Sequence, residues 1–172
     1  EAPRNSRDAL YQSLYEILSP LAFDEKRGIL RQLQVWSDAE PLLRNGYRSV
    51  SEEETKELAA SPQIEIGAHT VTHSVLSSQS ATEQKREIEE SRRTLESLTG
   101  RPVTSFAYPY GKRSHYTGKT VSLLRDSGFS CGCSNFWGVV TTNTNRFELP
   151  RIQALNCGAD EFAGHMDVWF QG

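Results

Sequence analysis

Two histidines, four positions apart, are the residues of this sequence best suited to chemistry. His69 and His73 directly follow the short apolar stretch 64–66. On a helical turn, two imidazoles at this spacing face the same way and reach one metal ion. The alternative is a pair of loop histidines that bond to backbone. Two histidines do not complete a catalytic zinc site, which usually has three protein ligands and one open position.

An aromatic turn is the second candidate. The sequence Tyr108-Pro109-Tyr110-Gly111 ends a predicted strand. A turn of this kind presents a backbone N–H, which is the group that stabilises a developing oxyanion. The ring of Tyr108 or Tyr110 is suited to stacking on a sugar. The alternative is an ordinary turn after a strand, with packed aromatic rings.

The third candidate is Arg151, which follows Leu149-Pro150. Its guanidinium is able to pair with a carboxylate and so to fix the orientation and ionisation of that group. The alternative is a surface arginine with no such partner.

The elements that position these residues alternate between strand and helix after residue 62. Apolar periodicity and caps predict strands at 64–66, 103–108, 129–133, 139–141 and 149–152, and helices at 80–100, 117–127 and 160–170. This alternation is typical of parallel β/α units in an open sheet or a barrel, which place chemistry in the loops that leave the strand C-termini. The first fifty residues read as helices, at 8–18 and from a cap at Asp24, and a third helix begins at Ser51.

The three candidates, in this order, resemble the motifs of the polysaccharide deacetylase family, also called carbohydrate esterase family 4 or the NodB homology domain. The family's His-Ser/Thr-x-x-His motif is matched by His69, Thr70 and His73. Its Pro-Tyr-Gly type of turn is matched by Pro109, Tyr110 and Gly111, and the arginine of a later motif by Arg151. The resemblance covers about residues 50–155.

The resemblance implies a distorted (β/α) barrel that binds a divalent metal, most often zinc, and removes N-acetyl groups from an amino sugar or polysaccharide. It assigns the metal to His69 and His73 and makes Thr70 a neighbour that steadies their loop. It assigns catalytic roles to Tyr110, whose N–H helps to hold the oxyanion, and to Arg151, which orients the base. Substrate contacts are expected at Pro109, Tyr110 and His115.

The sequence departs from the family at its first motif. That motif is an Asp-Asp pair that supplies a metal ligand and the general base, and no Asp-Asp occurs in residues 1–172. We interpret Asp24 as a helix cap, and His165 as a helical residue outside the pattern of the family's last histidine motif. The sequence therefore predicts an incomplete barrel whose remaining N-terminal part, with both acids, belongs to residues not in this chain. Residues 1–50 are expected to be a helical insertion, and residues 51–172 the C-terminal part of the barrel.

Two other functions stay open at this point. One is a non-catalytic carbohydrate-binding remnant of the fold, since the acids are missing. The other is a different metal hydrolase, in which Asp24 or Glu65 joins His69 and His73.

Composition sets the remaining limits. The chain has 172 residues and a net charge of −3, which argues against a dominant electrostatic surface for nucleic acid. No apolar run approaches the ~18 residues of a membrane span. The three cysteines form no closed disulfide framework, which favours a reducing compartment such as the cytoplasm, or simple buried thiols.

Overall fold

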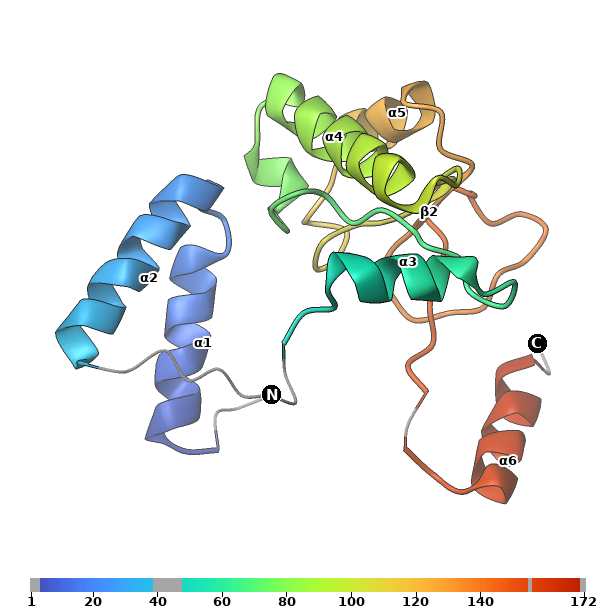
Figure 1. Cartoon of the computed structure of the whole chain (residues 1–172). Helices are drawn as coiled ribbons and strands as arrows, with labels where there is room; N and C mark the ends of the chain where they lie inside the picture. Colours follow the sequence, from blue (N-terminus) through green and yellow to red (C-terminus); the bar gives the residue numbers. More distant parts are fainter. Residues whose placement is uncertain (1–3, 39–47, 155, 171–172) are drawn as a thin grey trace.

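The computed structural model describes residues 4–38, 48–154 and 156–170 of the chain. Its helices are α1 (Ser6–Leu18), α2 (Phe23–Ser37), α3 (Glu52–Ala60), α4 (Ala81–Thr99), α5 (Gly118–Asp126) and α6 (Ala159–Phe170), with a short 3-10 helix, η2 (Leu76–Ser78). Its strands are β1 (Ser105–Ala107) and β2 (Cys131–Cys133). Helices α1 and α2 lie on one side of the central α/β unit, and α6 lies on another (Figure 1).

Capping residues set the helix ends that the sequence predicts best. The hydroxyl of Ser80 accepts from the Glu83 amide at 3.2 Å at the start of α4. Gly100 ends the helix with φ of 65°, a conformation that glycine adopts without steric cost. A reciprocal pair of bonds between Ser51 and Glu54 opens α3. These contacts confirm the predicted bounds of α4 and the predicted start of α3.

The predicted cap of α2 is wrong. The helix begins at Phe23 with Ala22 as its N-cap residue, so that Asp24 lies within the first turn. The carboxylate of Glu25 accepts the Ala22 amide at 3.3 Å and satisfies that end of the helix in place of an aspartate cap. Asp24 still suits the positive end of the helix dipole.

The strands form a parallel arrangement that is less regular than predicted. β1 pairs with β2 in the register Ser105 to Cys131. Single parallel bridges join Ala68 to Phe106 and Cys133 to Leu149, which gives four neighbouring parallel segments in the order 68, β1, β2, 149. The predicted strand at 64–66 is wrong, because these residues form no strand or bridge and the chain first pairs at Ala68. The predicted strand at 139–141 is irregular chain.

The core lies between this parallel arrangement and helices α4 and α5. Phe106 and Tyr108 from β1 and its continuation meet Leu124 of α5 and Ile88 of α4, and all four are at most 1% exposed. Gly132 of β2 has no room for a side chain, because an added Cβ would lie 2.7 Å from Cδ2 of Leu124 and 2.8 Å from the carbonyl oxygen of Phe147. The helices thereby hold the strands and their following loops in fixed positions.

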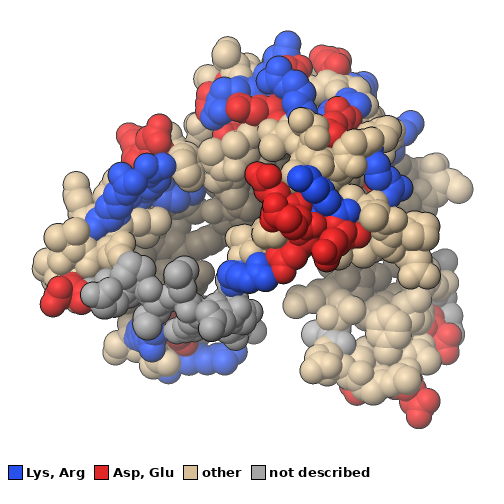
Figure 2. Space-filling view, viewed as in Figure 1, with Lys and Arg blue, Asp and Glu red and all other residues tan. Residues whose placement is uncertain are grey.

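Helices α1, α2 and α6 bury far less of their apolar surface. Val35 and Trp36 of α2 are more than 80% exposed, and Val168 and Phe170 of α6 are more than 60% exposed. Figure 2 shows Lys and Arg interspersed with Asp and Glu over the central unit, and fewer charges on the lobe that contains α6. Among the helices of the described residues, none is long and apolar enough to cross a lipid bilayer.

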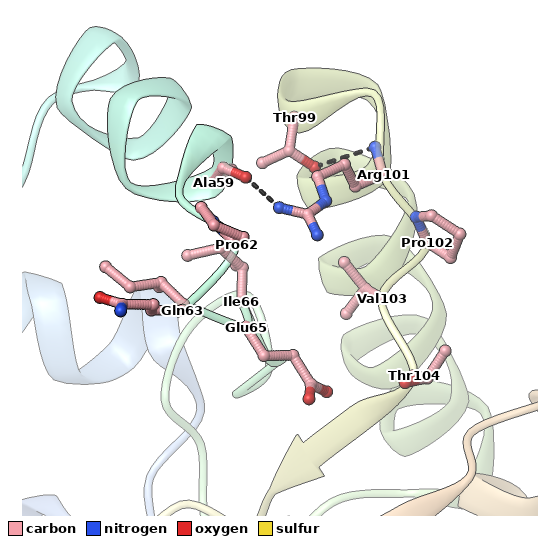
Figure 3. A pocket seen from close by; sticks show the side chains of 11 residues that line it. Ala59, Pro62, Gln63, Glu65, Ile66, Thr99, Arg101, Pro102, Val103 and Thr104 are labelled. Carbon is pink, nitrogen blue, oxygen red and sulfur yellow. Dashed lines mark hydrogen bonds between the residues drawn. The ribbon is translucent and has the colours of Figure 1, made fainter.

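A cavity of about 490 Å³ lies at the N-terminal end of the parallel segments (Figure 3). It is lined by the end of α3, by residues 62–66 and by residues 99–104, just before β1 begins. The guanidinium of Arg101 closes one side of it by donating to the carbonyl oxygen of Ala59. Glu65 lines this cavity, at the end of the segments opposite to His69.

Candidate active site

The candidate residues meet at one edge of the parallel arrangement. Each follows one of the four segments by at most three positions: His69 follows Ala68, Pro109 and Tyr110 follow β1, and Arg151 follows the bridge at Leu149. Parallel neighbours end at the same edge, so loops far apart in the sequence gather there. Ring contacts join His69, His73, Tyr110 and His115. Topology places Arg151 at the same edge, where its own contacts are to Ser134 and Phe136.

The two histidine rings lie close together. Their centroids are 4.8 Å apart with an interplanar angle of 69°. Nδ1 of His69 is 2.7 Å from the carbonyl oxygen of Ala107, which only accepts, so in the neutral tautomer Nδ1 carries the hydrogen and Nε2 keeps its lone pair. Burial, followed by the charges of His69 and Lys26, lowers the pKa of His73. The ring of His73 is thus favoured in the neutral form that binds metals.

The turn between the histidines has an unusual backbone. Thr70 and His73 have φ of 63° and 55°, in the left-handed region that side chains disfavour. Each such residue costs about 1–3 kcal/mol. The His73 amide donates to the hydroxyl of Thr70 at 3.0 Å, which places Thr70 as the residue that closes the turn. The spacing of four therefore comes from a tight turn and not from a regular helix.

The aromatic turn has a left-handed backbone as well. Tyr110 has φ of 61°, and the Gly111 amide donates to the Pro109 carbonyl at 2.7 Å, which closes a three-residue turn around Tyr110. The Asn135 amide donates to Gly111 at 2.8 Å and ties the turn to the chain after β2. Within the described parts of the chain, the Tyr110 N–H has no hydrogen-bond acceptor. It is available to a ligand, as an oxyanion donor must be.

The side chain of Tyr110 joins the two loops. Its ring lies 4.7 Å from that of His73, 5.4 Å from His115 and 5.7 Å from Tyr15 of α1. The Lys112 amide donates to Nδ1 of His115 at 3.3 Å, so Nε2 carries the hydrogen of the neutral ring. Burial, followed by the charge of Lys112, lowers the pKa of His115. Tyr15 and His115 also line a hollow of about 430 Å³ beside this cluster.

Arg151 is tied to backbone. Its Nε donates to the carbonyl oxygen of Ser134 at 2.6 Å, and its own amide donates to Phe136 at 3.0 Å. No carboxylate of the described residues forms an ion pair with it. The guanidinium is anchored at the end of β2, and the rest of it remains exposed at the edge where the loops gather.

The histidine pair has the chemistry of two metal ligands. Neutral imidazole is a normal ligand for zinc, and the two rings are close enough to share an ion. In residues 4–38, 48–154 and 156–170, however, no group of three His, Cys, Asp or Glu side chains gathers to hold one. In this structure neither Asp24 nor Glu65 forms such a group with the histidine pair. His165 lies on α6 against Trp169, where the ring centroids are 5.5 Å apart.

One buried acid of the site was missed by sequence reasoning. Glu87 of α4 is 1% exposed and bonds to the histidine turn. A signal was present, because Gln84, Glu87, Ser91 and Leu95 follow the helical spacing of the inward face that holds Ile88. A glutamate in such a stripe requires a buried partner.

Comparison with known proteins identifies the class. The sequence model of the family described as polysaccharide deacetylase matches residues 33–131. This chain belongs to the polysaccharide deacetylase family.

Individual relatives are similar at lower identity. Protein YxkH of Bacillus subtilis (strain 168) is 24% identical over 104 residues, which cover 60% of this chain and 36% of that protein. Deacetylase PplD of Streptococcus pyogenes, solved in complex with acetate, has a TM-score of 0.61 at 21% identity and matches 68% of this chain. Polysaccharide deacetylase BC0361 of Bacillus cereus has a TM-score of 0.59 at 23% identity and matches 67%. The fold is therefore that of the deacetylase structures.

The chain spans half or less of the length of each of these relatives. It spans 36% of YxkH, 50% of the PplD chain and 36% of the BC0361 chain. The α/β unit described above thus corresponds to part of the fold of these relatives.

Proposed function

We propose that this chain is part of a metal-dependent hydrolase that removes N-acetyl groups from an amino sugar or polysaccharide. The proposal depends above all on one observation. The His69–His73 turn, the Tyr110 turn and Arg151 follow neighbouring parallel segments and gather at one edge. Membership of the deacetylase family and the acetate in the PplD structure support the choice of reaction.

The proposed roles follow from the contacts. His69 and His73 would hold a divalent metal, which we propose to be zinc, with Nε2 of His69 kept as a lone-pair donor by the bond of Nδ1 to Ala107. When bound, such a metal supplies Lewis acidity at the acetyl carbonyl and lowers the pKa of an attacking water. The free N–H of Tyr110 donates to the oxygen that gains negative charge.

Substrate binding is proposed at the aromatic cluster. The rings of Tyr110 and His115 lie next to the histidine turn, and Tyr15 adds a further ring. The side chain of Pro109, also expected to contact substrate, is fully buried, so the proposal keeps it only as the residue before Tyr110 in the turn. Flat aromatic faces with nearby polar groups suit the apolar face of a sugar ring. The 430 Å³ hollow beside them gives a sugar unit room next to the reacting group.

The general base and the third metal ligand are proposed to come from an Asp-Asp pair outside the residues of this chain. Arg151 would orient that base through the part of its guanidinium that does not bond to Ser134. Residues 1–50 are proposed to be a helical insertion before the barrel part at 51–172. A non-catalytic carbohydrate-binding remnant remains the second candidate, because no described carboxylate joins the histidine pair.

The experiment measures acetate release from chitooligosaccharides and poly-N-acetylglucosamine by the zinc-loaded full-length protein. His69→Ala and His73→Ala are expected to reduce the rate by at least about a hundredfold, since each removes a proposed ligand. His165→Ala is the matched control, because this histidine lies on α6 outside the site. Sugar binding without acetate release from any of these substrates would favour the non-catalytic function.

A further inference from the structure

Glu87 is buried against the histidine turn and bonds to its backbone. Its Oε2 accepts from the amides of Val71 and Thr72 at 2.8 and 2.9 Å. Its Oε1 accepts from the Thr72 hydroxyl at 3.0 Å and from Arg86 at 3.0 Å. All four partners are donors, the arrangement that an acceptor-only carboxylate satisfies.

On its outer side, the Glu87 carboxylate pairs with Arg86, which belongs to a network of surface charges. Arg86 bonds to Glu83 at 2.6 Å and to Glu90 at 2.9 Å as well as to Glu87. Glu83 and Glu90 have side chains at least 40% exposed, whereas the side chain of Glu87 is 1% exposed. Of these three acids, Glu87 is the buried one, and it contacts the turn.

The segment held by Glu87 is the strained one. Val71 and Thr72 lie between Thr70 and His73, both of which have positive φ. The Val71 side chain is 48% exposed, so packing of this residue contributes little to the shape of the turn. The bonds to Glu87 therefore compensate the unfavourable backbone on both sides.

We propose that Glu87 is a positioning residue that sets the separation of the His69 and His73 rings for one divalent metal ion. It acts through the amides of Val71 and Thr72 and does not touch metal or substrate. This inference rests on the proposed function for its metal, but the shape of the turn exists without it.

Two isosteric variants of the full-length protein test the proposal. Glu87→Gln replaces one acceptor oxygen with an NH₂ group that faces hydrogen-bond donors, so some of the bonds to Val71, Thr72 and Arg86 are lost. Glu90→Gln is the matched control, because it removes a charge from the same Arg86 network without touching the turn. The readouts are amide hydrogen exchange at Val71 and Thr72 in the metal-free protein, and Zn²⁺ affinity by calorimetry.

Glu87→Gln is expected to accelerate exchange at both amides and to weaken Zn²⁺ binding by about tenfold or more, with Glu90→Gln within twofold of the wild type. Unchanged exchange at both amides in Glu87→Gln would overturn the proposal. If the wild type binds no Zn²⁺, the proposed function fails, while the exchange measurement still decides the role of Glu87. If Glu87→Gln does not fold, Thr72→Val removes one donor to Glu87, and the same two readouts decide.

Discussion

The turn at Gly111 allows a prediction whose size follows from the structure. Gly111 and Gly100 both have φ of 65°, but their surroundings differ. A Cβ on Gly111 would lie 2.6 Å from the Asn135 amide nitrogen and 3.0 Å from the Ser134 carbonyl carbon, whereas a Cβ on Gly100 meets nothing within 4 Å. The two glycines thus share one backbone conformation and differ in the space around it.

Gly100→Ala should cost about 1–2 kcal/mol of unfolding free energy, which is the price of a left-handed alanine. Gly111→Ala should cost that amount and about 1–3 kcal/mol more, because backbone atoms cannot move aside as a flexible side chain does. The same change should displace the Tyr110 N–H and lower the rate of acetate release, while Gly100→Ala leaves the rate unchanged.

Urea unfolding of the two full-length variants measures the difference, with equal m-values as the check that the comparison is valid. Equal destabilisation by the two substitutions would refute the reasoning, since the contact with Asn135 would then have no cost. A large loss of stability in Gly111→Ala with full deacetylase activity would refute the role given to the Tyr110 turn.

Three further predictions concern the core and the anchor at β2. Tyr108→Phe removes the hydroxyl that donates to the Phe147 carbonyl at 2.8 Å and should cost about 1–3 kcal/mol in urea unfolding at pH 8. Burial, followed by the charge of Tyr116, raises the pKa of Tyr108. The protonated hydroxyl therefore contributes fully to the free energy of unfolding below about pH 10, and this contribution is lost as the pH rises further. Tyr108→Phe lacks this group and should lose less stability between about pH 9 and 11 than the wild type. Leu124→Ala, at a fully buried position, should cost about 2–5 kcal/mol by thermal or urea unfolding, against less than about 0.5 kcal/mol for Val168→Ala on exposed α6. Arg151→Ala should lower kcat for acetate release with little change in KM, and an unchanged kcat would contradict its proposed role beside the base.

The sequence predicts long helices well because their signals are local. Ser80 and Gly100 bound α4, and both cap by contacts within a few residues. Short strands are different, since apolar residues alone do not determine pairing. Ile64 and Ile66 suggested a strand, yet only Ala68 meets a neighbour, and residues 139–141 have none among the described residues.

The sequence motifs predicted which residues form the site but not the backbone conformation that holds them. The spacing of His69 and His73 indicated a shared function but not a left-handed turn, because the φ values depend on contacts made elsewhere. Glu87 was missed for the same reason. Its position on the inward face of α4 is visible in the sequence, but its bonds to Val71 and Thr72 depend on how the helix packs.

Glu87 and the histidine turn that it holds lie in one continuous stretch of the chain, residues 69–87, and this bears on the order in which the site folds. The bonds from Val71 and Thr72 to Glu87 join residues only 16 and 15 positions apart, whereas the His69 bond to Ala107 joins residues 38 apart. Loops of short sequence separation close sooner and at lower entropic cost. The histidine turn can therefore take its shape as α4 forms, before β1 and β2 pair. Its position opposite the Tyr110 turn is fixed only when those strands come together.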